Sequence, residues 1–195
     1  MDHQNANSSE NWHIQTVLET GSTNADLMAA GHQGAPDRSV LRAEYQSAGR
    51  GRLDRTWEAP RGANLLVSLL FRHVPDRLHV LTQVVALAAT SVTQKTCGVD
   101  AQLKWPNDIL SENKKLCGVL IENLYRGTQL KASIVGIGLN VNQENFQGLV
   151  RASSMRLCSG VQFDIKEVFD HLLAEIENYI KQADTYSSLL KKYNE

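Results

Sequence analysis

Residues 64–72 read NLLVSLLFR, an almost continuous apolar run that ends in polar residues on both sides. A run of this length without alternation is typical of a β-strand buried on both faces, because an exposed face would need polar side chains at every second position. The fold is therefore predicted to be built on a sheet in which this strand is fully buried.

The pattern on either side of this strand mixes helices and strands. Further strands are predicted at 14–18, 39–45, 101–105, 109–124 (a hairpin with its polar turn at 111–114) and 131–141. Helices are predicted at 25–30, ended by Gly31, at 78–96, and from a capping box at Asp164 and Glu167 to the end of the chain. This order favours an α+β fold with a mixed, largely antiparallel sheet and helices packed on one side.

Composition excludes several classes of protein. The chain has 195 residues, with 20 Lys+Arg against 21 Asp+Glu, so its net charge of −1 argues against a nucleic-acid clamp or a polybasic membrane binder. Its longest uncharged stretch is too short and polar to span a bilayer. Three cysteines without ligand spacing predict reduced thiols, no structural metal site and a cytoplasmic location.

The chain shows no internal composition shift that would divide it into two domains. Residues 1–11 are uniformly polar and are predicted to be a disordered tail, not a secretory signal. Residues 12–195 are predicted to form one domain of ordinary size.

The segment Gly49-Arg-Gly-Arg-Leu-Asp-Arg-Thr-Trp57, here called the arginine loop, carries the clearest chemical signal. From 49 to 64 there are four arginines against two acids in a chain that is negative overall. Alternating Gly and Arg forms neither a core nor a stable helix, and the guanidinium fork binds phosphate and carboxylate through two hydrogen bonds. We predict an anion-binding loop, with a solvated loop as the alternative.

Three other places are ambiguous on spacing alone. Lys104 and Asp108 flank a turn after a strand and serve either as turn residues or as phosphate and Mg²⁺ contacts. Lys115, with Gly118 beyond it, is an exposed turn lysine or a point charge at a pocket mouth. The two glycines before Asn140 indicate tight packing or close approach of a ligand.

Taken together, these motifs resemble the biotin protein ligase family. Seven stretches match in the family's order: Gly21-Ser-Thr-Asn24, Glu44-Tyr-Gln-Ser-Ala-Gly-Arg-Gly-Arg52, Arg55-x-Trp57, Gly62-Ala-Asn64, Lys104-Trp-Pro-Asn-Asp108, Lys115-Leu-Cys-Gly118 and Gly136-x-Gly-x-Asn140. The resemblance runs from about residue 13 to 180. It implies that the chain joins biotin to ATP as biotinyl-5′-AMP and then transfers biotin to one lysine of a biotin carboxyl carrier protein.

The resemblance also implies roles for individual residues. The catalytic residues would be Arg50, Lys115 and Asp108, with Asp108 as the candidate Mg²⁺ ligand. Biotin would be bound by Ser22, Thr23, Asn24, Gln46, Arg50, Gly51, Arg52, Lys115 and Gly118. ATP and the adenylate would be bound by Arg52, Arg55, Trp57, Asn64, Lys104 and Asn140.

Several expectations go with this resemblance. ATP and biotin would be substrates, Mg²⁺ would accompany the nucleotide, and a homodimer through a sheet face or edge would be compatible with the family. The chain has only a short tail before the core and ends near its last helix, so neither an N-terminal DNA-binding domain nor a C-terminal β domain is expected. The alternatives are a lipoate or octanoate ligase or transferase of the same fold, and a remnant that binds biotin without catalysis.

Overall fold

The computed structural model describes residues 12–193 apart from residues 54, 73–77, 106, 147 and 149–150, and it describes no side chains for 78–79 and 184–193. The predicted tail at 1–11 lies outside the described residues. The described elements are β1 (His13–Val17), α1 (Thr23–His32), β2 (Ser39–Ala43), β3 (Leu65–Phe71), α2 (Leu78–Cys97), β4 (Gln102–Lys104), β5 (Asp108–Ser111), β6 (Lys114–Arg126), β7 (Gln129–Leu139), α3 (Met155–Ser159) and α4 (Ile165–Tyr193).

The described strands form one sheet of seven in the order β1-β2-β3-β7-β6-β5-β4. Only β1 and β2 run parallel, and every other neighbouring pair is antiparallel. The α+β class and the mixed, largely antiparallel sheet are confirmed. The apolar run at 64–72 forms β3, and every residue of β3 is buried.

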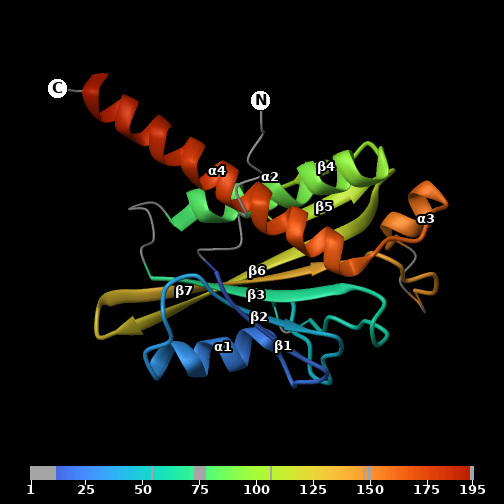
Figure 1. Cartoon of the computed structure of the whole chain (residues 1–195), viewed down its shortest axis with the longest axis horizontal. Helices are drawn as coiled ribbons and strands as arrows, with labels where there is room; N and C mark the ends of the chain where they lie inside the picture. The colour runs from blue at the N-terminus through green and yellow to red at the C-terminus, as the bar shows by residue number, and fades with distance from the viewer. Residues whose placement is uncertain are drawn as a thin grey trace, which may run out of the picture.

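Helices cover both faces of the sheet, so the prediction that they all lie on one side is wrong for α1 (Figure 1). On one face, alternate β3 residues such as Leu65 and Leu69 share a core with side chains of α2 and α4. On the opposite face, Leu70 packs with Leu27 of α1 and Leu124 of β6. Because successive strand residues point to opposite faces, a strand that is apolar throughout requires a covering layer on each side.

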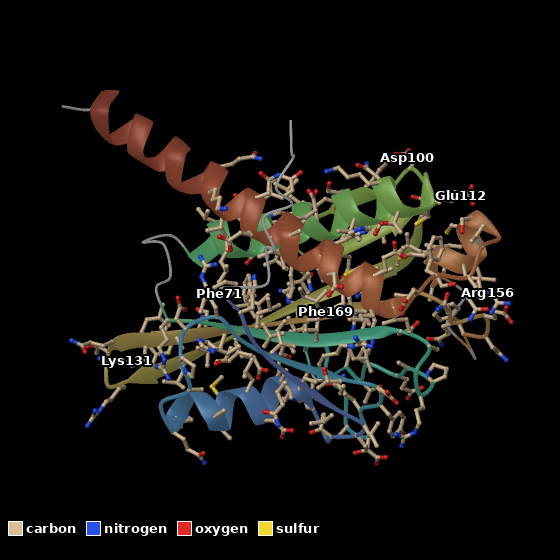
Figure 2. All side chains as sticks on the ribbon, viewed as in Figure 1. Phe71, Asp100, Glu112, Lys131, Arg156 and Phe169 are labelled. Atoms are coloured by element: carbon tan, nitrogen blue, oxygen red, sulfur yellow. The ribbon has the colours of Figure 1, made fainter. Side chains whose placement is uncertain are left out.

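The two long helices follow the predicted spacing. Five apolar residues at helical spacing in α2, Leu81, Val84, Val85, Ala88 and Val92, are buried, and the helix ends at Cys97, followed by Gly98 with a φ of 64°. Figure 2 shows Phe71 of the sheet and Phe169 of α4 in the layer between the sheet and these helices.

The sequence pattern predicted that Gly31 ends α1, but the helix continues to His32. A Cβ atom on Gly31 would lie 3.0 Å from Cδ1 of Leu70 and 3.2 Å from Cδ1 of Leu124. The glycine therefore lets the last turn of α1 approach the sheet closely, which fixes the height of the helix above the strands.

The β5–β6 hairpin is confirmed and places two predicted site residues. Glu112 and Asn113 both have positive φ, 49° and 61°, as a two-residue turn of the primed type requires. The turn leads from Asp108 at the start of β5 to Lys115 near the start of β6. None of the described helices is long and apolar enough to cross a membrane.

Candidate active site

A cleft on the α1 face of the sheet is floored by glycines of β6 and β7. Gly118 pairs with Gly138, and Gly136 pairs with Ser68 of β3 on one side and Leu120 of β6 on the other. Nine predicted site residues line this cleft: Thr23, Asn24, Gln46, Arg50, Gly51, Arg52, Trp57, Lys115 and Gly118. Residues separated by up to 95 positions in the sequence thus meet at one site.

The described part of the arginine loop is folded as a small hairpin above this floor. Gly51 N donates to the Arg55 carbonyl at 2.7 Å, and Trp57 N donates to the Gly49 carbonyl at 2.9 Å. A Cβ atom on Gly49 would lie 2.3 Å from the Trp57 carbonyl oxygen, so only glycine fits at that position. The first glycine of the motif is thus required by the turn itself.

Trp57 lies across the glycine floor. A Cβ atom on Gly138 would come within 2.4 Å of the indole Cε2, and one on Gly118 within 3.0 Å of Cζ3. Lys115 Nζ is 5.5 Å from the centre of the ring, which is within the range of a cation–π contact. Gly138, which the sequence assigned to tight packing or ligand approach, and Gly118 therefore leave room for the Trp57 side chain of the loop.

A chain of hydrogen bonds lines the α1 end of the cleft. Thr23 N donates to Gln46 Oε1 at 2.7 Å, and the Thr23 hydroxyl lies 2.7 Å from Ser68 Oγ. Ser68 donates to Asn24 Oδ1 at 2.6 Å, and Asn24 Nδ2 donates to Glu122 Oε2 at 2.8 Å. The Thr23 hydroxyl also lies 3.0 Å from Gln46 Oε1, so its one proton can be donated either to Gln46 or to Ser68.

Lys115 is the most strongly held cation of the cleft. Its Nζ lies 2.7 Å from Asp108 Oδ1, with about a third of each side chain exposed. Its main chain is fixed by Lys115 N donating to the Arg151 carbonyl at 2.7 Å and by Ser153 N donating to the Lys115 carbonyl at 2.9 Å. The lysine is thus a positioned charge and not an exposed turn residue.

The two arginines at the start of the loop have different partners. Arg50 Nη2 donates to Glu122 Oε2 at 3.0 Å, whereas Arg52 Nη1 donates to the neutral Asn107 Oδ1 at 3.0 Å. Among the described residues, the cleft therefore has three cationic side chains, of which two have an acid partner, an excess of positive charge suited to an anionic ligand.

Six other predicted residues do not line this cleft: Asp108, which pairs with Lys115, and Ser22, Arg55, Asn64, Lys104 and Asn140. Ser22 is the N-cap of α1, although its side chain makes no capping hydrogen bond, while Arg55 and Lys104 are exposed. Asn64 and Asn140 are buried and bonded to the protein, Asn64 Oδ1 to Val141 N at 3.0 Å and Asn140 Nδ2 to the Ser153 carbonyl at 2.9 Å. Asn140 thereby holds the segment that fixes Lys115.

Sequence reasoning missed three residues of the site, namely Ser68, Asn107 and Glu122. Ser68 and Glu122 were signalled only by being polar within apolar strands, since a polar residue at a buried strand position usually has a specific partner. Asn107 was read as a turn residue, and its carbonyl and side-chain amide bond to Val119 of β6 at 2.9 and 2.8 Å.

Among the described residues no group of three or more His, Cys, Asp or Glu side chains could hold a metal ion. Asp108 alone faces Lys115 across an ion pair. Mg²⁺ in proteins is usually bound by one or two carboxylates together with substrate phosphate oxygens and water molecules. The single carboxylate of Asp108 therefore fits Mg²⁺ only when the ion is bound together with a nucleotide.

Cys117 is predicted to be unreactive in the folded protein. It is fully buried beneath the cleft, and burial raises the pKa of its thiol to about 12, with the nearby Lys115 charge acting in the opposite direction. At neutral pH the thiol therefore stays protonated and inert. Alkylation with iodoacetamide, followed by peptide mass spectrometry, should leave Cys117 unmodified until denaturant is added. Rapid native labelling would contradict this burial.

Comparisons with known proteins agree with this geometry. Residues 19–140 match the Biotin/lipoate A/B protein ligase family. The chain is 34% identical over 180 residues to the bifunctional ligase/repressor BirA of Bacillus spizizenii, covering 88% of this chain and 54% of that protein. It is 34% identical over 179 residues to the biotin--[acetyl-CoA-carboxylase] ligase of Paracoccus denitrificans, covering 87% of this chain and 74% of that one.

The fold also matches a solved structure. The biotin protein ligase from Aquifex aeolicus in complex with biotin and ATP superposes with a TM-score of 0.77 at 31% identity, covering 87% of this chain and 71% of that one. The chain spans about half the length of the BirA proteins from Bacillus that it matches. With the family match over residues 19–140, the 34% identity to a biotin--[acetyl-CoA-carboxylase] ligase and this common fold, the chain belongs to the biotin/lipoate A/B protein ligase family, among the biotin protein ligases.

Proposed function

We propose that this chain activates biotin with ATP to biotinyl-5′-AMP and pyrophosphate, and then transfers biotin to a lysine of a biotin carboxyl carrier protein. The observation that carries the proposal is the convergence of Arg50, Arg52 and Lys115 on one glycine-floored cleft. The relatives named biotin ligases, and the relative that binds biotin and ATP, support the choice of substrates.

The chemistry needs this concentration of positive charge. A carboxylate oxygen of biotin attacks the α-phosphorus and pyrophosphate leaves, so two anions must approach each other before the bond forms. Fixed cations lower the repulsion and stabilise charge on the transferring phosphoryl group. In the second step the ε-amine of the carrier lysine attacks the acyl carbon, AMP leaves, and the amine loses a proton.

The geometry supports a division of roles. Thr23, Asn24 and Gln46 offer directed hydrogen-bonding groups suited to a neutral polar head, at the α1 end of the cleft. Lys115 offers a positioned cation beside Asp108 and the Trp57 ring. Trp57 and the loop cover the floor and limit the access of water to a mixed anhydride that hydrolyses readily.

The residues proposed to contact ATP are supported mainly by the resemblance to the biotin protein ligase family. Arg55 and Lys104 are exposed and are proposed to bind the ATP phosphates. Asn64 and Asn140 would act indirectly, by holding the strand ends and the segment that fixes Lys115. Asp108 is proposed to contribute one carboxylate to the Mg²⁺ that accompanies ATP. The three free cysteines are consistent with the reducing cytoplasm that we propose as the compartment.

Biotin-dependent exchange of labelled pyrophosphate into ATP tests the first step, and biotinylation of a carrier domain tests the second. We expect exchange with biotin and not with lipoate, and labelling of one carrier lysine. Exchange with lipoate or octanoate alone would assign the chain to the other branch of the family. A thermal shift with biotin but no exchange would instead identify a binding remnant.

A further inference from the structure

Glu122 is a charged residue of the cleft to which neither the sequence motifs nor the proposed reaction assigns a role. It lies on β6 opposite Ile134, on the face that carries α1, and its side chain is 27% exposed. One of its oxygens, Oε2, accepts hydrogen bonds from Asn24 Nδ2 at 2.8 Å and from Arg50 Nη2 at 3.0 Å. A single carboxylate oxygen thus joins the start of α1 to the arginine loop.

The ion pair between Glu122 and Arg50 is better suited to positioning the arginine than to stabilising the fold. The Arg50 side chain is 47% exposed, and an ion pair this accessible to water and salt contributes little to the folding free energy. It does fix where the guanidinium lies, because Arg50 is otherwise carried by a loop rich in glycine. Within the described part of the chain, Arg52, two residues further on, has a neutral amide partner in Asn107.

The loop is fastened to α1 at two points. Gln46, just before the loop, accepts a hydrogen bond from Thr23 N, and Arg50, inside it, reaches Asn24 through Glu122. Thr23 and Asn24 are themselves linked through Ser68 of β3. These contacts close a ring, and Glu122 is the member of that ring whose charge holds the arginine.

We propose that Glu122 is a positioning residue that acts through Arg50: it holds the arginine loop down on the glycine floor and so retains the acyl-adenylate in the cleft. This inference rests on the proposed function for the identity of the retained intermediate. The positioning itself is a property of the loop and is measurable without ligase activity.

Trypsin cleaves after arginine, so the rate of tryptic cleavage within the arginine loop measures how firmly the loop is held. We expect Glu122→Gln to accelerate tryptic cleavage after Arg52 and Arg55 several-fold, measured on the full chain by mass spectrometry. Glutamine keeps an oxygen for Asn24 and removes only the charge. Glu144→Gln is the matched control, since Glu144 forms an ion pair with Arg156 at 2.5 Å outside this cleft. Equal cleavage in the two variants would overturn the positioning role.

Activity measurements separate retention from chemistry. In Glu122→Gln we expect several-fold more biotin on a bystander protein, while biotin-dependent pyrophosphate exchange falls no further than in Arg50→Gln, because Glu122 acts through that arginine. Raising the salt concentration should increase bystander labelling by the parent but not by the variant, because the ion pair is screened. A fall in exchange with unchanged labelling would overturn the retention role.

A double-mutant cycle tests whether Glu122 acts through Arg50. If it does, Glu122→Gln combined with Arg50→Gln should label bystanders and expose the Arg52 cleavage site no more than Arg50→Gln alone. Multiplicative effects would overturn the coupling. If the parent itself shows no exchange, the proposed function fails, whereas the proteolysis comparison still decides the role of Glu122 in holding the loop.

Discussion

Replacing Lys115 by alanine is expected to lower biotin-dependent pyrophosphate exchange by about 100- to 1,000-fold, the usual cost of removing one fixed group that stabilises charge in the transition state. Lys115 Nζ is held between Asp108 and the Trp57 ring, and its main chain is fixed at both its amide and its carbonyl. A charge held in this way needs little reorganisation when the phosphoryl group is transferred, so its loss should affect kcat more than substrate binding.

The neighbouring lysine provides the control for this prediction. Lys114 is exposed at the start of β6 and does not line the cleft, so Lys114→Ala should leave exchange unchanged. Circular dichroism and the thermal midpoint should show that both variants are folded. Near-normal exchange by Lys115→Ala, or equal losses in the two variants, would show that Lys115 is only a turn residue.

The second large effect is expected from Gly136→Ala, which adds one methyl group to the floor. Its Cβ atom would lie 2.3 Å from Asn24 Oδ1, and Asn24 is 4% exposed, so the amide has nowhere to move without breaking its bonds to Ser68 and Glu122. Overpacking of this kind costs about 1–3 kcal/mol of stability. We also expect biotin affinity to fall at least about tenfold, which corresponds to about 1.4 kcal/mol.

Urea denaturation and a biotin titration would measure these two effects. Gly21→Ala is the control, because a Cβ atom there meets no atom within 4 Å. Removing the clashing side chain gives a sharper test: Asn24→Ala with Gly136→Ala should be less destabilised than the sum of the two single variants. Additive losses, or a Gly136→Ala variant that binds biotin normally, would mean that Asn24 does not lie over Gly136.

Local patterns predicted those elements in which neighbouring residues determine the conformation. The uninterrupted apolar run gave β3, the helical spacing of valines and alanines gave α2, and the polar turn gave the β5–β6 hairpin. The side of the sheet covered by α1 could not be predicted. That helix is short and buries Thr23 and Asn24 with Leu27 and Gly31, so its sequence shows no clear apolar stripe.

The candidate site, like the fold, could be predicted from the sequence only in part. The alternating Gly and Arg of the arginine loop predicted an anion-binding loop, whereas spacing alone left Lys115 open between a turn residue and a charge at the cleft. The partners of those cations were not evident, because Glu122 and Asp108 lie 72 and 7 positions from the residues that they pair with. Ser68 gave no more than a hint, as one hydroxyl in an apolar strand.

The sequence by itself determined the buried strand and the residue types that an anion-binding reaction requires, since these depend on composition and short-range spacing, and the resemblance of its motifs indicated the family. The tertiary structure decided which of those residues share a cleft, that Trp57 lies over the glycines, and that Asn64 and Asn140 support the site from within the protein. The physical reason is that strand pairing sets these neighbours: the register of β3, β7 and β6 brings Ser68, Gly136 and Leu120 into one row, and sequence distance carries no record of that register.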